Sequence, residues 1–364
     1  MIINEIIDDL RNRIVRGEYA PGCPLERRSE LLKQCGASNV TVQRAISQLR
    51  KEGFLESRGS KGMYVVSNPP HTSRFALVLP PRRQNGQENN DPRWNALEIA
   101  AEEILQNFPA YRIEQYLIDR NGGNEQPEYQ RLLNDLKLGR LAGTLLPVPF
   151  PKPLLEPLSH YPLVLQEPLH QNLVPAVVYL YDYDAMTKLA VDILLARGCR
   201  RIALLISSAT NPVLGSQLER IWMQRSPETR PEWFQGVYVE PQQMRWNSRI
   251  VKLMFSSNNA LIPDGLIILN EKSTPDIVEV LNAMGFFPGE NIHVVAHRNL
   301  PFVTQRLDKI DYVAFNNSLL LQQGVKAITQ YRSLNLTGER FVPPEYVPAS
   351  GLPQIKDILV SMPK

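Results

Sequence analysis

The stretch that decides the fold runs from Ser38 to Leu49 and reads Ser-Asn-Val-Thr-Val-Gln-Arg-Ala-Ile-Ser-Gln-Leu. Ser38 is a preferred helix N-cap residue and directly follows a Gly36-Ala37 turn. One face of the predicted helix is apolar, because its hydrophobic residues recur at helical spacing: Val42, Ala45, Ile46 and Leu49. The opposite face is polar: Asn39, Thr41, Gln43, Arg44, Ser47 and Gln48. Such a face suits base edges in a DNA major groove, although a solvated amphipathic helix has the same pattern.

Two further helices are predicted before this one. The first ends at Gly17 and has one apolar stripe, formed by Ile3, Ile6, Ile7, Leu10 and Ile14. The second covers Arg28 to Cys35 and is separated from the 38–49 helix by the Gly36-Ala37 turn. Helix, short turn and helix in this order is the helix-turn-helix arrangement.

A hairpin is predicted after the third helix, which continues to a stop at Gly53. Strands at 54–55 and 63–66 flank the polar loop 58–62. This pattern predicts a wing whose Arg58 and Lys61 reach phosphate or the minor groove, with a plain solvated hairpin as the alternative.

Length and charge agree with a small basic domain joined to a larger neutral part. A chain of 364 residues with 43% hydrophobic residues predicts two or three domains with sizeable cores. Residues 1–68 hold eleven Lys and Arg against eight Asp and Glu, so they carry the whole net charge of +3. A basic bias confined to this segment fits a nucleic-acid contact there.

Cysteine usage and the N-terminus indicate the compartment. The cysteines are few and scattered: Cys23, Cys35 and Cys199. They form no metal-ligand spacing and are typical of a reducing compartment. We expect no signal peptide, since Glu5, Asp8 and Asp9 fall in the first ten residues, and no run approaches the ~20 apolar residues that span a bilayer. We therefore expect a cytoplasmic protein that does not act at a membrane.

Residues 1–66 resemble the winged helix-turn-helix domain of the GntR family of bacterial transcription regulators. The matching residues follow the whole domain in order: Gly17-Glu18-Tyr19-Ala20-Pro21-Gly22, Leu25, Leu31, Gly36-Ala37-Ser38, Thr41-Val42, Ala45, Leu49, Glu52-Gly53-Phe54-Leu55 and Gly59 to Val65. The resemblance implies an α+β domain that binds double-stranded operator DNA. From it and the exposed pattern we expect these DNA-binding residues: Arg27, Arg28, Ser38, Asn39, Thr41, Gln43, Arg44, Arg58 and Lys61.

Two departures from the family pattern concern DNA contacts. The family usually has Pro-Ser-Glu-Arg where this chain has Glu26-Arg27-Arg28-Ser29. A DNA-contacting arginine of the family thus becomes Ser29, and Arg28 or Arg27 takes its place. A second family arginine, in the recognition helix, becomes Gln43. The operator sequence of relatives therefore does not carry over.

The hydrophobic pattern of the sequence changes after the proline-containing linker 69–73. Apolar strand-like runs alternate with helical patterns, so the sheets should be parallel with right-handed crossovers. Strands are predicted at 75–79, 111–118, 143–147, 163–166, 177–180, 202–206, 265–269 and 293–296. Helices are predicted at 93–107, 128–138, 185–196 and 275–284. Residues 207–260 show no clear assignment.

Residues 74–364 resemble the effector domain of LacI/GalR-type regulators, which is similar to periplasmic sugar-binding proteins. The residues that carry this resemblance are Tyr181-Asp182 through Leu194, Arg197 to Leu205, Pro263 to Ile268, Met284-Gly285, Pro288 to Ile292 and Val294-Val295. It implies two lobes with a ligand held between them at the carboxyl ends of parallel strands. We expect lobe one at about 74–198 and 300–331, and lobe two at about 199–299 and 332–364, with crossings near Cys199, Asn299 and Arg332.

Six positions match the family's ligand pocket: Arg93, Trp94, Gln166, Arg220, Asn270 and His297. Trp94 offers a flat apolar face to a sugar ring, and the polar members supply hydrogen bonds to hydroxyls or a carboxylate. His297 stands where relatives usually have aspartate. Ordinary helix packing for Trp94 and a surface loop for His297 are the alternatives.

The sequence predicts a ligand-responsive DNA-binding regulator, most simply a repressor, which acts as a homodimer by family resemblance and takes a sugar or another small polar metabolite as effector. We expect neither catalysis nor a metal or cofactor, because the common nucleophile, nucleotide-loop and zinc motifs do not occur and the five histidines are isolated. A solute-binding sensor that does not act through DNA is the alternative.

Overall fold

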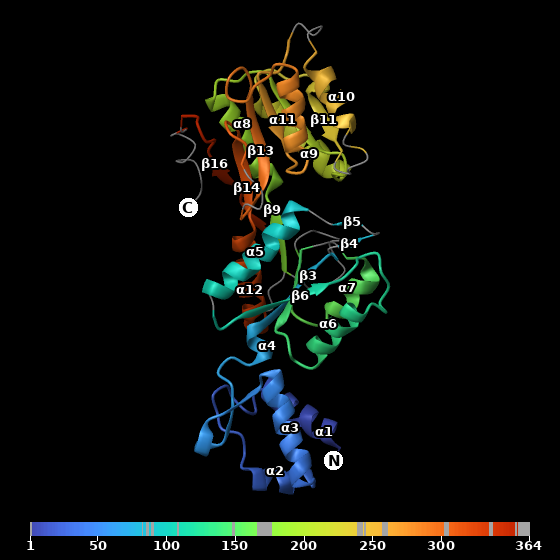
Figure 1. Cartoon of the computed structure of the whole chain (residues 1–364), viewed down its shortest axis with the longest axis vertical. Helices are drawn as coiled ribbons and strands as arrows, with labels where there is room; N and C mark the ends of the chain where they lie inside the picture. The colour runs from blue at the N-terminus through green and yellow to red at the C-terminus, as the bar shows by residue number, and fades with distance from the viewer. Residues whose placement is uncertain are drawn as a thin grey trace. The chain divides into compact units, whose positions relative to one another are not determined.

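The computed structural model describes residues 2–81, 83–84, 87–88, 91–107, 109–147, 150–165, 177–238, 243, 245–256, 261–301, 306–334, 338–353 and 355. Contacts divide the chain into two compact units. Figure 1 labels helices and strands of both. Unit 1 comprises Met1–Asn89, Ala101–Leu180 and Leu321–Arg340, and unit 2 comprises Asn90–Ala100, Tyr181–Leu320 and Phe341–Lys364.

Residues 2–66 form the head, a three-helix domain with a hairpin wing inside unit 1. Its elements are α1 (Ile3–Val15), α2 (Arg28–Cys35), α3 (Asn39–Glu52), β1 (Leu55–Ser57), the short 3-10 turn η1 (Gly59–Lys61) and β2 (Met63–Val65). The strands pair antiparallel with Leu55 opposite Val65. The apolar stripes of the helices meet in one core with Phe54, which is fully buried. The predicted winged helix-turn-helix is thus confirmed, with helix boundaries within two residues of those expected.

A second sheet, which we call lobe one together with its helices, also belongs to unit 1. Its strand order is β15-β9-β8-β7-β3-β6, and the pairs from β9 to β6 are parallel. The elements from the connector onward are α4 (Pro70–Ser73), β3 (Arg74–Leu79), β4 (Arg83–Gln84), β5 (Gln87–Glu88), α5 (Pro92–Asn107), β6 (Arg112–Leu117), α6 (Pro127–Lys137), β7 (Gly143–Leu146), α7 (Lys152–Leu158), β8 (Leu163–Leu165), β9 (Val177–Tyr181), α12 (Asn317–Leu334) and β15 (Gly338–Val342). The expected linker 69–73 contains the short helix α4, of which Pro70, His71 and Ser73 are buried.

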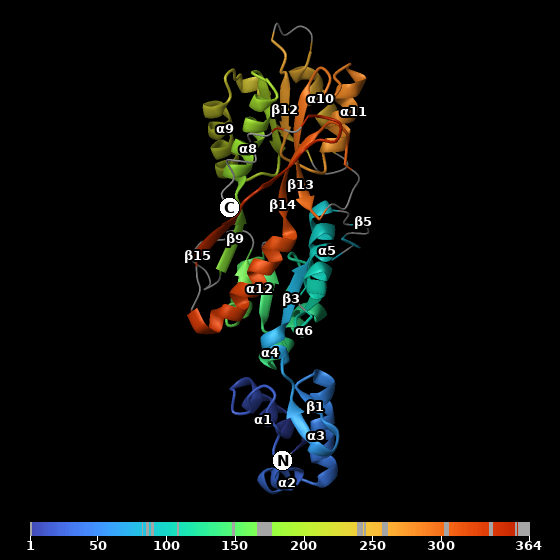
Figure 2. The ribbon, with the colours of Figure 1, turned by 90° about the vertical axis from the view of Figure 1, so that its left-hand side faces the viewer.

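Unit 2, called lobe two, contains a sheet of order β11-β10-β12-β13-β14-β16. Its elements are α8 (Tyr183–Ala196), β10 (Ile202–Ser207), α9 (Pro212–Arg225), the 3-10 turn η2 (Pro231–Trp233), β11 (Phe234–Val237), α10 (Arg245–Met254), β12 (Gly265–Ile268), α11 (Thr274–Ala283), β13 (His293–Leu300), β14 (Asp311–Asn316) and β16 (Glu345–Val347). Helix α8 packs beside α9 and α10 beside α11, and Figure 2 shows these pairs on opposite faces of the sheet. The start of α5, up to Ala100, is also part of this unit.

The parallel sheets are confirmed, with one exception in lobe two. Strand β16 runs antiparallel to β14, with Tyr312 opposite Val347. Its edge position is held by Asp311, which accepts hydrogen bonds from the Tyr346 hydroxyl and the Ala349 N–H at 2.9 Å each. Arg197 completes this anchor with two hydrogen bonds to the Asp311 carboxylate, at 2.9 and 3.0 Å.

The observed segment limits differ from the expected ones. The sequence analysis expects crossings near Cys199, Asn299 and Arg332, whereas the contacts put unit boundaries after these residues: Asn89, Ala100, Leu180, Leu320 and Arg340. Strand β13 also continues to Leu300, beyond the expected end at Ala296, because it pairs with β14 along residues 295–300. None of the described helices is both long enough and apolar enough to cross a membrane.

Candidate nucleic-acid interface and ligand site

The N-terminus of α3 is capped by its first side chains. The Ser38 hydroxyl accepts the Thr41 backbone N–H at 3.2 Å and lies 2.8 Å from the Thr41 hydroxyl. Arg28 donates to the Asn39 carbonyl at 3.3 Å, which joins the start of α2 to the start of α3. These contacts fix the end of the helix that a major groove would receive.

The polar face of α3 is exposed, and its apolar face is part of the head core. Asn39, Gln43 and Arg44 are exposed, and Thr41 is half-buried. On the opposite face, Val42 and Leu49 are fully buried. Sequence reasoning missed one exposed neighbour, Val40, which is 61% exposed although apolar. Its position outside the apolar stripe was the available signal, and an apolar side chain there suits a thymine methyl group.

The wing contains two cations, Arg58 and Lys61, which differ in whether an acidic residue pairs with them. Arg58 is bound to Glu56 at 2.8 Å, and its guanidinium carbon lies 4.4 Å from the centre of the Tyr64 ring. Lys61 is exposed, and the described residues provide it with no ion-pair partner. Lys61 is therefore better placed than Arg58 to neutralise a phosphate.

The remaining expected DNA contacts lie at the start of α2. Arg27 and Arg28 are both exposed. The backbone N–H of Arg27 donates to Glu30 at 3.1 Å, so the α2 terminus is capped by its own acidic residue. All nine expected DNA-binding residues belong to the head, and eight of them are exposed.

Three of the six expected ligand residues come together in lobe two. Arg93 and Trp94 lie in the first turn of α5, and the Arg93 guanidinium carbon is 5.0 Å from the centre of the Trp94 ring. His297 lies within β13, not in a surface loop. The rings of Tyr181 and Phe315 connect His297 to Arg93.

An aromatic platform that the sequence analysis missed supports this cluster. The rings of Tyr181 and Phe315 stack at 4.2 Å with an interplanar angle of 8°, and His297 lies 5.5 Å from Phe315. The Arg93 guanidinium carbon is also 5.6 Å from the centre of the Tyr181 ring. The aromatic run Tyr179-Leu-Tyr181-Asp-Tyr183 was the signal in the sequence. Tyr181 and Phe315 are buried, so they support the side chains of Arg93 and His297 from below. The ring of Trp94 is only half-buried, and an aromatic ring beside a cation suits a polar ring compound such as a sugar.

His297 is electrically neutral at physiological pH. Burial, with a contribution from the positive charge of Arg93, lowers the pKa of His297 to about 4. Its Nε2 atom is buried without a hydrogen-bond partner among the described residues. Since buried polar atoms are normally satisfied, this nitrogen is available to a ligand hydroxyl.

The other expected ligand residues lie elsewhere or have other roles. Asn270 accepts hydrogen bonds from the Ser273 N–H at 3.0 Å and the Ser273 hydroxyl at 3.1 Å, so its carbonyl oxygen orders the entry into α11. Arg220 is exposed in the middle of α9, and no contact among the described residues joins it to Arg93, Trp94 or His297. Gln166 lies outside the described residues. Within the described part of the chain, no group of three or more His, Cys, Asp or Glu side chains is arranged to hold a metal ion.

Comparison with known families identifies the head. Residues 2–65 match the family model described as "Bacterial regulatory proteins, gntR family". The N-terminal domain is therefore a gntR-type helix-turn-helix domain, as the sequence resemblance indicated.

The sequence relatives match about a fifth of this chain. One relative is the mannosyl-D-glycerate transport/metabolism system repressor MngR of Escherichia coli (strain K12), which is 41% identical over 77 residues, or 21% of this chain and 32% of that protein. The chain spans about a third or less of the length of the curated relatives it matches.

Solved structures match most of the chain in fold. The dimeric Lac repressor with an 11-residue C-terminal deletion superposes with a TM-score of 0.57 at 13% identity, over 76% of this chain and 97% of that chain. The transcriptional regulator CelR in complex with cellobiose gives a TM-score of 0.55 at 15% identity, over 85% of this chain and 89% of that one. The two parallel-sheet lobes thus have the fold of LacI-type effector domains.

Proposed function

We infer from the gntR-type head and the LacI-type lobes that this chain is a ligand-responsive, sequence-specific DNA-binding transcription regulator, most simply a repressor. The observation that carries the proposal is the capped N-terminus of α3 with its exposed polar face, beside a wing with a free cation among the described residues. That arrangement matches a recognition helix and wing placed on a duplex.

The proposed division of labour on DNA follows from the side chains. Asn39, Thr41 and Gln43 read base edges, because amide and hydroxyl groups make directional hydrogen bonds there. The cations hold phosphates and supply the sequence-independent affinity: Arg27, Arg28, Arg44, Arg58 and Lys61. Ser38 contributes by capping α3.

We propose that the chain acts as a homodimer on a near-palindromic operator, with two recognition helices in major grooves about 34 Å apart. Support comes from the fold shared with the dimeric Lac repressor. A regulator of chromosomal operators acts in the bacterial cytoplasm, which is the compartment we propose.

The proposed effector is a sugar or another small polar metabolite bound at the Arg93, Trp94 and His297 cluster. The half-buried Trp94 ring, the Arg93 cation beside it and a neutral histidine nitrogen support this class. A related fold binds cellobiose in CelR, and MngR is named for mannosyl-D-glycerate. We propose no catalytic role, in agreement with relatives that are transcription regulators.

Two measurements test the function. The purified chain is mixed with a random duplex library, and repeated rounds of selection should enrich one near-palindromic sequence. A thermal-shift screen then tests cellobiose and other acidic and neutral sugars. A true effector should raise the melting temperature of the chain by mass action. Failure to enrich any sequence contradicts the DNA-binding function, and binding of a sugar without any DNA preference favours a pure solute sensor.

A further inference from the structure

The last residue of α3 is a buried acid. The Glu52 side chain is only 6% exposed and lies at the C-terminus of the helix proposed to read DNA. A helix C-terminus carries partial negative charge, so a carboxylate is unfavourable there unless cations compensate for it. Burial adds a desolvation cost that an isolated charge does not recover. The partners of Glu52 therefore decide whether this end of α3 is stable.

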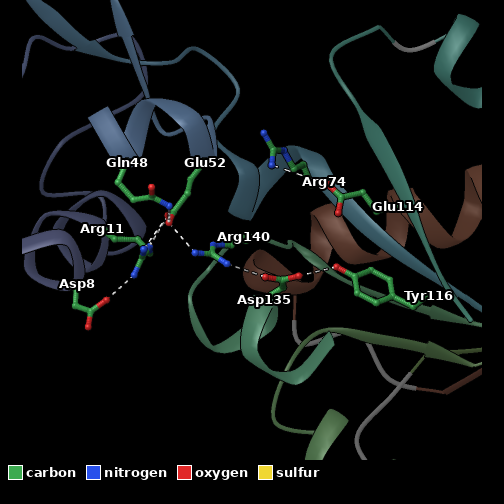
Figure 3. A network of polar contacts seen from close by, with 9 residues as sticks. All are labelled: Asp8, Arg11, Gln48, Glu52, Arg74, Glu114, Tyr116, Asp135 and Arg140. Carbon is green, nitrogen blue, oxygen red and sulfur yellow. Dashed lines mark hydrogen bonds and ion pairs between the residues drawn. The ribbon is translucent and has the colours of Figure 1, made fainter. Parts of the chain in front are cut away.

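One arginine within the head and one outside it bind Glu52 (Figure 3). Arg11 of α1 donates to Glu52 Oε2 from Nε at 3.1 Å and from Nη2 at 2.7 Å. Arg140, which follows α6 in lobe one, donates from Nη2 to Glu52 Oε1 at 2.6 Å. Gln48 adds a hydrogen bond to the same Oε1 atom at 3.0 Å. Arg11 completes the head internally, whereas Arg140 attaches α3 to lobe one.

The net effect of these contacts keeps Glu52 charged. Burial raises the pKa of Glu52, but hydrogen bonds from Arg140, Gln48 and Arg11 outweigh burial, so the pKa lies below its ordinary value. The ion pair with Arg140 is therefore formed across the neutral pH range.

Arg140 is itself held in place by lobe one. Its Nη1 atom donates to the Asp135 carboxylate at 3.1 Å, and its backbone N–H donates to the Asp135 carbonyl at 2.8 Å. Asp135 also accepts the Tyr116 hydroxyl at 3.0 Å. Tyr116 is fully buried on β6, so a continuous chain of polar contacts runs from the sheet of lobe one to the recognition helix.

A second arginine of lobe one meets the same helix end. Gly53 ends α3 with a φ of +84°, and a Cβ atom at that position would collide with the guanidinium of Arg74. Arg74 is the first residue of β3 and lies 3.9 Å from Glu114 of β6. The C-terminus of α3 thus faces two cations of lobe one: Arg74, which begins β3, and Arg140, which follows α6.

Solvent reaches the contact between Arg140 and Glu52. A groove of about 600 Å³ runs beside it, with Asp8, Arg44, Lys51 and Leu138 among its lining residues. The Arg140 side chain is 28% exposed, so it can be replaced with less risk to folding than the buried Glu52 or Arg11.

We propose that Arg140 is a positioning residue for DNA binding: by holding Glu52, it fixes the orientation of α3 on lobe one. The proposal rests on the proposed function, because it assigns Arg140 a role in DNA binding. It concerns a residue that touches no DNA and lies outside the head.

The first experiment measures the attachment without DNA. Hydrogen–deuterium exchange of the full chain is compared for the wild type, Arg140→Gln, Arg140→Lys and Arg112→Gln. Arg112 is the matched control, since it is an exposed arginine on β6 of the same lobe and donates to the carbonyls of Pro109 and Tyr111 instead of to the head. Arg140→Gln should speed exchange in 50–54 and 138–141 by about tenfold, Arg140→Lys should restore part of the protection, and Arg112→Gln should leave both segments unchanged.

The second experiment measures positioning on DNA with the duplex selected by the wild-type chain. The wild type should bind this duplex about tenfold more tightly than the same duplex with two base pairs inserted between its half-sites. Arg140→Gln should lower that discrimination to about twofold while its affinity for a single half-site stays as in the wild type. A merely structural role would weaken all three duplexes alike.

The two experiments fail in different ways. Unchanged exchange together with unchanged spacing discrimination in Arg140→Gln overturns the positioning role. Faster exchange in Arg140→Gln, with no duplex enriched by the wild type, overturns the DNA-binding function and leaves Arg140 as a structural attachment of the head.

Discussion

Ser38 and Thr41 are bound to each other at the N-terminus of α3, with 2.8 Å between their hydroxyl oxygens and 3.2 Å from the Thr41 nitrogen to the Ser38 hydroxyl. Ser38 therefore orders the start of the helix that we propose to read DNA.

The Ser38 cap of α3 should contribute to the stability of the head. Ser38→Ala should destabilise the head by about 1 kcal/mol, because one backbone N–H loses its acceptor. Ser38→Asp should retain most of the stability, since aspartate also caps, and should bind DNA more weakly because its charge repels phosphate. Denaturant unfolding and DNA titration check the two effects, and equal stability of the alanine variant would contradict the capping role.

Base reading is expected to depend on Gln43. Its side chain is exposed on α3, and no described residue occupies its amide. Gln43→Ala should cost about 1–3 kcal/mol on the selected duplex and flatten the preference at one base position. Binding to a panel of single-base variants measures this. A uniform loss on every duplex would show that Gln43 does not read sequence.

The two wing cations should differ in their effect on salt dependence. Lys61→Ala should weaken binding to all sequences alike and reduce the salt slope by about 1. Arg58→Ala should change the slope less, since Glu56 already neutralises Arg58 at 2.8 Å. Binding measured across a salt series compares the variants, and a larger slope change for Arg58 would reverse this assignment.

The lowered pKa of His297 predicts a pH dependence of lobe two. The pKa of His297 is about 4 in the folded chain against an ordinary value of 6.5, so the unfolded chain binds more protons between these values. Stability should therefore fall as the pH decreases from 6.5 towards 4. His297→Asn removes this contribution, and the difference between the melting temperatures of variant and wild type should shrink over that window. A constant difference would contradict the lowered pKa.

Two arginine–aspartate pairs in lobe two offer a matched stability comparison. In the Arg197–Asp311 pair the side chains are 7% and 3% exposed, whereas in the Arg225–Asp192 pair they are 41% and 39% exposed. Arg197→Ala should cost about 3–5 kcal/mol, because it leaves a buried carboxylate without its cation. Arg225→Ala should cost about 1 kcal/mol or less. Thermal unfolding of both variants tests the contrast, and similar losses would refute it.

Elements with strong local patterns were predictable from the sequence. The helix stripe and the Ser38 and Gly53 boundaries gave α3 almost residue by residue, because burial and capping act within a few positions. The region 207–260 contains helices α9 and α10, which the sequence analysis left unassigned, and strand β11, an edge strand with a mostly half-buried, weakly apolar pattern. The antiparallel β16 depends on its contact with Asp311, which no local pattern shows.

The candidate sites, too, are predictable from the sequence only where a local pattern places their residues. The exposed residues of α3 follow from helical periodicity alone. Arg93 and His297 were proposed from the family's pocket positions, but the Tyr181–Phe315 platform joins residues more than a hundred positions apart. From the sequence, Glu52 is an acidic residue at the end of a predicted helix. Its contact with Arg140 depends on the fold, since the two residues lie 88 positions apart.

The fit of Gly53 against Arg74 has a consequence for building hybrid regulators. A recognition domain transplanted from another protein would keep its own hydrophobic centre, yet it would dock on this scaffold only if it brought an acid at position 52 and a glycine at position 53. Domain shuffling in such proteins is thus restricted at the junction by the residues at positions 52 and 53 of the head and by Arg74 and Arg140 of lobe one, and a working chimera needs all four to match.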